Sequence, residues 1–307
     1  MKVDRVKKVV SIAIIGIWIA FSAASSSAQG PVDMSAATPP PPTAETQPPA
    51  AHTSEAELEK ARKASQNPIA SMISVPFQEN WNFGIGAADR IQNVFVIQPV
   101  IPIGLGSSWN VITRWVTPIV YQPYAVPQES GPPIQTGAYG IGDIQPQFYF
   151  SPKKSGAITW GAGPIFQVPT GSPYRYLSQG KFAMGPTFVA LAQPHFGTIG
   201  VLVNNIWSVG GHKDRPDVNQ FYLQPFFNYN LKKAWYLSLQ STGITANWEK
   251  DTNRWVVPIG GGPGRVWRVG HQAVNVQTFF FGNVVHPKGA SPWTFRMQFT
   301  LLFPKPR

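Results

Sequence analysis

The stretch WTFRMQFTLLF, residues 293–303, decides the fold because its polarity alternates from one residue to the next. One face carries Trp293, Phe295, Met297, Phe299, Leu301 and Phe303. The other face carries Thr294, Arg296, Gln298 and Thr300, and only Leu302 breaks the pattern. Successive side chains of a β-strand point to opposite faces, so this period predicts a strand with one apolar and one polar face.

The same alternation recurs from about Val75 onward, in segments bounded by turn residues. We expect twelve strands, at about residues 75–86, 90–103, 108–122, 138–151, 156–169, 180–193, 196–209, 217–231, 233–248, 253–268, 271–285 and 291–303. An even number of antiparallel strands, with both termini at one end, is typical of outer-membrane barrels. The sequence therefore predicts an all-β protein whose residues 67–307 form an antiparallel transmembrane β-barrel of about twelve strands.

The expected connections alternate in length. Those after the second, fourth, sixth, eighth and tenth strands are short, such as Pro194–His195. Those after the third, fifth, seventh and eleventh are longer and polar, such as Pro123–Gly137. Short turns at one end and longer loops at the other are the pattern of an outer-membrane barrel. The links after the first and ninth strands are also short and depart from it.

The first 28 residues read as a secretory signal peptide. Four basic residues between Lys2 and Lys8 precede an apolar run from Val9 to Phe21, and small residues then lead to a cleavage point after Ala28. The alternative is an uncleaved membrane anchor. That run is shorter than the ~20 residues a helix needs to span a bilayer. We therefore expect the mature protein to leave the cytoplasm.

Two further segments precede the barrel. Residues 29–53 are rich in Pro, Ala and Thr and predict a disordered spacer, because they hold too little apolar surface to build a core. Residues 54–66 predict a short helix, with Ser54 and Glu57 at capping-box spacing. Leu58 is its only large apolar residue. We expect a solvated helix, with a periplasmic contact or a plug inside the barrel as alternatives.

The composition excludes several classes of function. The chain has no cysteine, which rules out disulfides, a cysteine zinc site and a thiol nucleophile. Charged residues make up 13% of the sequence and hydrophobic residues 43%, which is not the composition of a disordered chain. The net charge of +11 is spread along the sequence and forms no basic stripe, so we expect no nucleic-acid partner.

Tryptophans mark both ends of the expected strands. Four lie near short turns, namely Trp109, Trp160, Trp235 and Trp267. Four lie near the longer loops, namely Trp207, Trp248, Trp255 and Trp293. Aromatic residues gather at the two membrane–water interfaces of barrels, so these eight predict two girdles.

Prolines and glycines within the strands conflict with this reading. Eight prolines fall inside the expected strands, namely Pro99, Pro102, Pro118, Pro146, Pro164, Pro186, Pro225 and Pro258. Proline cannot donate to a ladder, so we expect each to lie at a bulge, at a position without a hydrogen bond, or beyond the end of a shorter strand. The run Gly260-Gly261-Gly262-Pro263-Gly264 predicts a strand broken by a bend.

The polar faces should line the lumen. On this phase the inward set with charge or hydrogen-bonding capacity includes Arg114, Asp143, Gln147, Asn204 and Arg296, with Lys181 at the outer mouth. Basic groups exceed acidic ones, which predicts a mild preference for anions. The alternative is a filled polar interior in which Arg114 or Arg296 pairs with Asp143.

No arrangement for catalysis stands out. None of the five histidines lies in the middle of an expected strand. His212 with Asp214, Asp217 and Ser208 is the one candidate for a hydrolase or metal site, and polar loop residues need no such explanation. We therefore expect no enzyme activity, no catalytic residues, no metal and no cofactor.

Several ordered segments resemble a known family. They are "NPIASMISVPFQENWNFG" (67–84), "IQPVIPI" (97–103), "GIGDIQPQFYFSP" (140–152), "LVNNIWSVGG" (202–211), "DVNQFYLQPFFNYNL" (217–231), "ITANWE" (244–249), "RWVVPIGGGPGRV" (254–266) and "FTLLFPK" (299–305). The family is that of proteobacterial putative transporters named for the meta-pathway of phenol degradation, whose members are sometimes mislabelled neuromedin U. The resemblance implies an outer-membrane β-barrel with a role in uptake of small compounds, aromatic ones among the candidates.

The last strand also resembles the assembly signal of outer-membrane proteins, with Phe303 as its aromatic end and four residues after it. The expected partners are therefore outer-membrane lipid, the barrel-assembly machinery and a small solute. The expected location is the outer membrane of a Gram-negative bacterium. The expected function is a porin-like channel for passive uptake of small aromatic or anionic solutes. The alternatives are a tethering barrel with a filled lumen and a barrel hydrolase.

Overall fold

A computed structural model describes residues 55–303, apart from residues 71, 131 and 271. The expected signal peptide and Pro-rich spacer lie outside the described residues. The strands are β1 (Ile73–Ile85), β2 (Arg90–Ile97), β3 (Val100–Leu105), β4 (Trp109–Val126), β5 (Ile134–Ile141), β6 (Gln145–Pro152), β7 (Ile158–Gln167), β8 (Lys181–Ala192), β9 (Gly197–Gly211), β10 (Asn219–Asn230), β11 (Trp235–Gln240), β12 (Ile244–Asn247), β13 (Trp255–Val269), β14 (Gln272–Val285) and β15 (Trp293–Phe303). Two helices accompany them, α2 (Glu55–Ser65) and α3 (Tyr174–Leu177).

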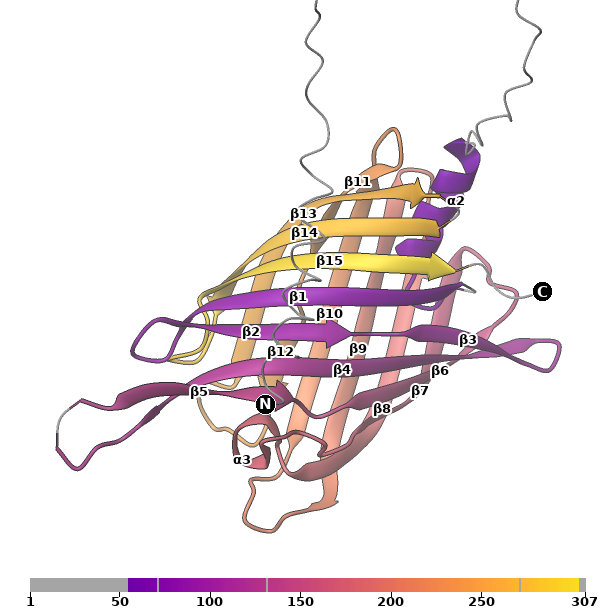
Figure 1. The fold of residues 1–307 in the computed structure, drawn as a ribbon. Helices are drawn as coiled ribbons and strands as arrows, with labels where there is room; N and C mark the ends of the chain where they lie inside the picture. The colour runs from indigo at the N-terminus through magenta and orange to yellow at the C-terminus, as the bar shows by residue number, and fades with distance from the viewer. Residues whose placement is uncertain (1–54, 71, 131, 271, 304–307) are drawn as a thin grey trace, which may run out of the picture. The chain divides into compact units, whose positions relative to one another are not determined.

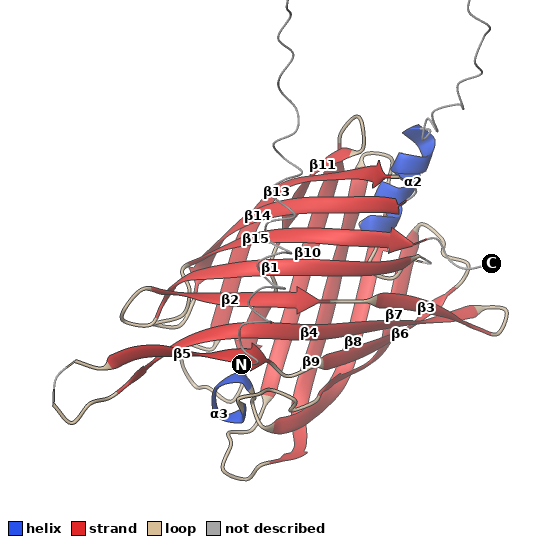
Figure 2. Cartoon of the chain, viewed as in Figure 1, coloured by secondary structure: helices blue, strands red, loops and turns tan. Residues whose placement is uncertain are grey.

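These strands close into one antiparallel barrel with twelve positions around the wall (Figures 1 and 2). Three positions hold two strands each. β2 and β3 both lie between β1 and β4, β5 and β6 both pair with β4, and β11 and β12 both lie between β10 and β13. The pairing of β15 with β1 and of β9 with β10 completes the ring. The predicted twelve-stranded β-barrel with a short helix is confirmed.

The two ends of the barrel differ. We call the end where β1 begins and β15 ends the short-turn end, because the connections there are brief. At the opposite, long-loop end, the β7–β8 connection carries α3. α2 is not a membrane-crossing element: among the described residues, no helix combines enough length with enough apolar character to traverse a bilayer.

The prolines lie where the ladders are already interrupted. Pro99 falls in the gap between β2 and β3. Pro164 and Pro186 face each other directly across β7 and β8. The ladders on their other sides skip both residues, since the β6–β7 and β8–β9 pairings have gaps there. The missing N–H groups therefore fall at irregular positions, one of the solutions a closed sheet allows.

The glycine run forms a continuous strand, so the predicted bend is wrong. β13 extends unbroken through residues 260–264 and pairs with both β11 and β14. The run serves close approach instead. A Cβ on Gly260 would lie 2.0 Å from the carbonyl oxygen of Phe280, and one on Gly262 would lie 1.8 Å from that of Thr278. Only a residue without a side chain fits so near a neighbouring backbone.

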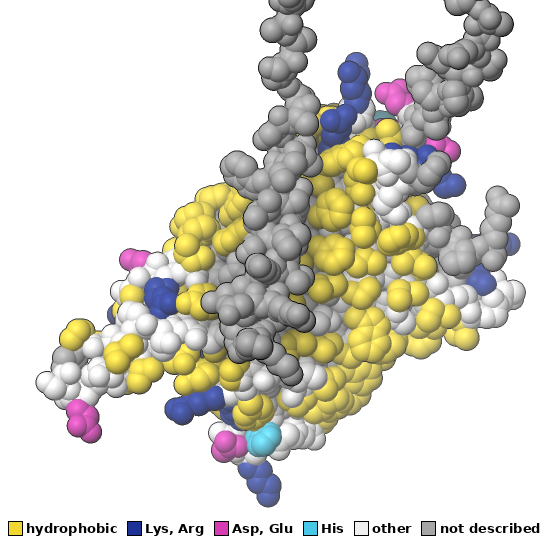
Figure 3. Space-filling view, in the orientation of Figure 1, with side chains coloured by type: hydrophobic (Ala, Val, Ile, Leu, Met, Phe, Trp, Pro, Cys, Tyr) yellow, Lys and Arg dark blue, Asp and Glu magenta, His cyan; other side chains and the backbone are white. Residues whose placement is uncertain are grey.

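The outer surface of the wall is apolar, as Figure 3 shows for one face. Large exposed residues such as Leu239, Ile259 and Phe280 point outward from neighbouring strands. The eight tryptophans expected in the girdles lie near strand ends, and all of them except the half-buried Trp267 are exposed. Trp109 and Trp160 contact each other edge-on near the short-turn end, with ring centroids 6.1 Å apart.

One acidic residue departs from this apolar surface. Glu79 lies near the middle of β1, in register with Phe95 on one side and Met297 on the other, and shares their outward face. A carboxylate facing lipid at mid-depth costs free energy, although less than the roughly 2–4 kcal/mol of a basic residue. The alternation of β1 assigns it this face. Its half-buried position among aromatic neighbours limits its exposure.

We predict that Gly262→Ala destabilises the barrel by about 1–3 kcal/mol, because the new methyl group must displace the backbone of β14. The matched control is Gly282→Ala, where an added Cβ meets nothing within 4 Å. The measurement is the urea midpoint of unfolding, followed by the different gel migration of folded and heated barrel. Equal midpoints for the two variants would contradict the close-approach explanation.

Candidate functional site

The lumen contains a cavity of about 190 Å³ in which amide side chains are the most frequent kind of lining residue. Four of the six residues predicted to line the lumen, Arg114, Gln147, Asn204 and Arg296, surround this cavity. Strand register brings them together. Arg114 stands opposite Gln147, and the alternation along β9 and β15 turns Asn204 and Arg296 to the same inner face. Glutamines from β1, β6 and β10, namely Gln78, Gln145 and Gln224, complete the wall together with Gln98 from the gap between β2 and β3.

Arg114 is held by neutral acceptors. Its Nη2 donates to Oε1 of Gln98 at 2.6 Å, and its Nη1 donates to Oε1 of Gln147 at 3.4 Å. The Tyr149 hydroxyl donates to the same Gln147 oxygen at 2.7 Å. Arg114 is therefore oriented without being neutralised.

Arg296 is the more deeply buried of the two, with 7% of its surface exposed. Its Nε donates to Oδ1 of Asn80 at 2.7 Å, and its guanidinium lies over the Phe281 ring, 5.1 Å from the centroid. Within the described part of the chain, no carboxylate forms an ion pair with either arginine. The two positive charges thus share one cavity with only polar and aromatic partners.

Asp143 has a different role from the one predicted. It lies in the gap between β5 and β6, and its carboxylate accepts the backbone N–H groups of Gly171 at 3.0 Å and Gln179 at 2.8 Å. Neither cavity includes it among its lining residues. Both carboxylate oxygens of Asp143 therefore bind the β7–β8 connection, one near its start and one near its end.

That connection folds against the inner face of the long-loop end. Ser172 forms a bridge with Ile141, and its carbonyl occupies the space a Cβ on the inward-facing Gly140 would need. From the next loop, Arg215 donates to the carbonyls of Tyr174 and Arg175. The mouth of the lumen is therefore narrowed by residues 168–180.

Lys181 lies at this mouth and is paired. Its Nζ donates to Oδ1 of Asp217 at 2.9 Å, and the Ser208 hydroxyl donates to the same oxygen at 3.1 Å. The hydrogen bond from Lys181 lowers the pKa of the Asp217 carboxyl. Lys181 does not line either cavity, so the structure places it in a loop contact and not beside Arg114 and Arg296.

The loop around His212 shows how the hydrolase and metal candidates are arranged. His212 Nδ1 lies 3.9 Å from Asp214, and its ring packs on Tyr174 with centroids 4.7 Å apart. Ser208 is hydrogen-bonded to Asp217 and to the backbone of Val218, not to His212. Nowhere in the described residues do three His, Asp or Glu side chains gather as metal ligands would.

α2 packs on the short-turn end, so the expected solvated helix is solvated on one side only. Its Ala61 packs in an apolar cluster with the inward-facing Tyr236, Val266 and Leu302, and Leu58 joins that cluster. Just after the helix, Ile69 is buried in a second cluster inside the barrel. The sparse apolar stripe suffices because only one side of the helix packs on the barrel, whereas Glu55, Lys60 and Lys63 are exposed. The helix therefore docks at this end of the lumen, with one buried and one exposed side.

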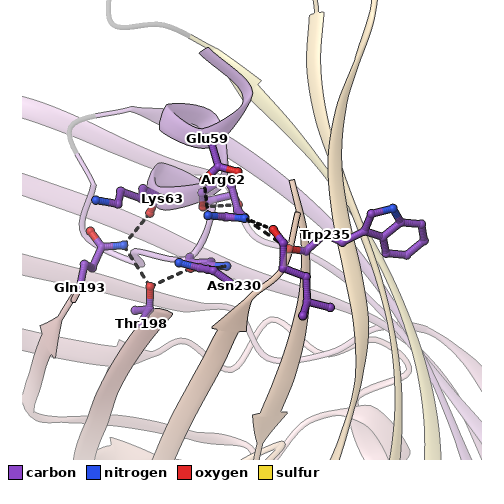
Figure 4. A network of polar contacts seen from close by, with 10 residues as sticks. Glu59, Arg62, Lys63, Gln193, Thr198, Asn230 and Trp235 are labelled. Atoms are coloured by element: carbon purple, nitrogen blue, oxygen red, sulfur yellow. Dashed lines mark hydrogen bonds and ion pairs between the residues drawn. The ribbon is translucent and has the colours of Figure 1, made fainter. Parts of the chain in front are cut away.

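Polar contacts fix the helix to the barrel rim (Figure 4). Arg62, 3% exposed, donates to the carbonyls of Leu231 at 2.9 Å and Trp235 at 3.3 Å, and it also pairs with Glu59. Its neighbour Gln66 accepts from the Thr198 hydroxyl at 2.7 Å. Burial lowers the pKa of the Arg62 guanidinium, and Glu59 opposes that shift.

The two arginines whose face the glycine run left undecided are also placed. Arg268 forms an ion pair with Glu57 of α2, with Nη1 and Oε2 3.2 Å apart. Arg265 stands opposite Trp235 on the outer face, and its guanidinium lies over that ring, 5.1 Å from the centroid. Only Arg268 faces the helix.

We predict that Arg62→Ala raises the single-channel conductance, because it removes hydrogen bonds from a buried charged group worth about 2–3 kcal/mol to the docked helix. Deleting residues 55–65 should raise the conductance further. Lys60→Ala on the exposed face of the same helix is the control and should leave the conductance unchanged. Unchanged conductance after the deletion would contradict the plug.

Comparison with known proteins places the fold. No protein-family model matches the sequence, and none of the curated proteins matches it. Among solved structures, an outer-membrane channel from Pseudomonas putida F1 aligns with a TM-score of 0.55 at 11% identity, over 76% of this chain and 94% of that chain. The NanC porin aligns with a TM-score of 0.47 at 8% identity, over 74% of this chain and 98% of that chain. The first likeness shows that this chain has the fold of an outer-membrane channel.

Proposed function

We propose that this protein is an outer-membrane channel through which small solutes diffuse, with a preference for anions. One observation carries the proposal: a barrel with an apolar outer wall encloses a polar cavity, and Arg114 and Arg296 are the charged residues that line it among those the structure describes. A lumen charge attracts ions of opposite sign and repels those of like sign, so two arginines favour anions.

The placement of the carboxylates supports the same sign. Those of the described residues lie in α2, at the long-loop end or, for Glu79, on the outer face. Two of the three acids of α2 form ion pairs, Glu59 with Arg62 and Glu57 with Arg268. Among these residues, no carboxylate therefore lies beside Arg114 and Arg296 to neutralise their positive charge.

The finer parts of the proposal rest on the sequence. The signal peptide ending near Ala28 and the alternating last strand support export and assembly into the outer membrane of a Gram-negative bacterium. In that membrane the short-turn end faces the periplasm. The resemblance to the family named for phenol degradation supports uptake of small aromatic compounds, and the lumen arginines support uptake of anionic ones. We further infer that transport is passive and that no catalytic step is involved.

We predict discrete conductance steps in a planar bilayer, with a reversal potential of the anion-preferring sign in a salt gradient. Arg114→Gln with Arg296→Gln should abolish the preference, bringing the anion-to-cation permeability ratio to about one or below, because both lumen charges are removed. Arg265→Gln is the matched control, since it removes an arginine from the outer face.

Two results would count against the proposal. A cation-preferring wild type would leave a channel but reject the role of the arginines. A folded barrel that conducts nothing, even without residues 55–65, would reject the channel. The observed docking of α2 in the lumen would then favour the second candidate function, a tethering barrel with a filled interior.

A further inference from the structure

Two arginines from different strands of the barrel line the same space inside the lumen. Arg114 comes from β4 and Arg296 from β15, with the strands β1 and β2/β3 between them around the wall. Both line the cavity of about 190 Å³ and a second one of about 150 Å³ nearer α2. The residues common to the two cavities are Gln78, Gln98, Arg114, Leu202, Gln224 and Arg296. The arginine pair therefore stands at the junction of the two spaces.

The pair keeps unused capacity for an anion. A guanidinium offers five N–H donors in a planar fork. Arg296 uses its Nε on Asn80, and its terminal nitrogens have no hydrogen-bond partner within residues 55–303 as described. Arg114 uses its terminal nitrogens on two glutamine amides that could turn toward a ligand. Like charges buried together destabilise each other, and a bound anion would relieve that repulsion.

The rest of the wall indicates an organic anion. Val96, Ile165, Leu202 and Ile206 contribute apolar surface to the cavity that holds the arginines. A chloride or phosphate ion gains nothing from such surface, whereas a short hydrocarbon body is stabilised there. A carboxylate also matches the guanidinium fork with two parallel hydrogen bonds.

The volume limits the size of the ligand. The cavity that holds the arginines and Leu202 measures about 190 Å³. Pockets for drug-sized ligands are larger, about 300–1,000 Å³. The space suits a carboxylate with a few carbon atoms.

From these observations we propose that the lumen holds a saturable binding site for one small monocarboxylate, with the carboxylate at Arg114 and Arg296 and the apolar body against Leu202 and its neighbours. The inference deepens the proposed channel function and rests on it for the route by which the ligand enters. Binding itself is an equilibrium property of the folded barrel, so it can be measured without conduction.

The test is calorimetric titration of the full-length folded protein in detergent at low salt. The probes are butyrate and butyramide, which have nearly the same shape and differ in charge. We expect butyrate to bind with one-to-one saturation and to weaken as salt is added, and butyramide to give no saturable signal.

Variants assign the site. Arg296→Gln and Arg114→Gln should each weaken butyrate binding about tenfold or more, since each removes a charge-assisted contact. Arg296→Lys keeps the charge and loses the fork, so it should fall between wild type and Arg296→Gln. Arg265→Gln, on the outer face, should bind like wild type. Heat-dependent gel migration verifies that each variant is folded, and the half-buried Arg114 provides a second route if Arg296→Gln does not fold.

Separate outcomes test the site and the channel. Anion-preferring conductance without saturable butyrate binding would overturn the site and leave the channel. Saturable binding by a barrel that does not conduct would support the site and reject the channel. Equal binding of butyramide, or an equal loss in Arg265→Gln, would overturn the carboxylate site.

Discussion

A strand that faces lipid has no water to satisfy its backbone, and the whole architecture depends on that constraint. Closing the sheet through β15 and β1 pairs the two edges that an open sheet would leave exposed. The prolines show how strict the requirement is. Pro164 and Pro186 are accommodated opposite each other, where the ladders on both outer sides are already irregular. The missing donors of these two prolines thus fall beside gaps in the flanking ladders.

Closure also separates two solvents by a single layer of backbone. Each strand presents one set of side chains to lipid and the other to the lumen, so a charge one residue away from Arg296 would have the opposite environment. Inside, the charges are distributed by depth. The two ends hold acids matched to bases, as in Glu57 with Arg268 and Asp217 with Lys181, whereas the waist holds two bases without acids. That asymmetry gives the lumen its electrostatic character.

Much of this was predictable from the sequence, because the period of two is strong. The alternation of Trp293 to Phe303 gave the face of Arg296 directly, and it is the face on which the structure places it. Strand interruptions at residues 98–99, 142–144 and 241–243 were not predicted, since glycine, proline and serine also occur inside unbroken strands such as β13. The glycine run misled for a related reason: its local flexibility suggested a bend, whereas its use is close approach to the carbonyls of neighbouring strands.

The positions of Asp143 and α2 depend on contacts between residues far apart in the chain. Asp143 has the inward phase, yet a folded loop takes both of its oxygens. The helix has a weak apolar stripe, which indicates a solvated helix when it is considered without the barrel. Its packing on the barrel depends on residues far away in the sequence. No local pattern could reveal that Arg62 reaches carbonyls about 170 residues later in the sequence.

The attachment of α2 has a mechanical consequence. The helix precedes β1 in the chain, so a pull on the chain ahead of Glu55 is borne first by the contacts of Arg62, Gln66 and Ile69, and only then by the wall. Those contacts are few, whereas β1 is paired with both β15 and β2. Under load the contacts of the helix therefore break before the strand pairing of the barrel does.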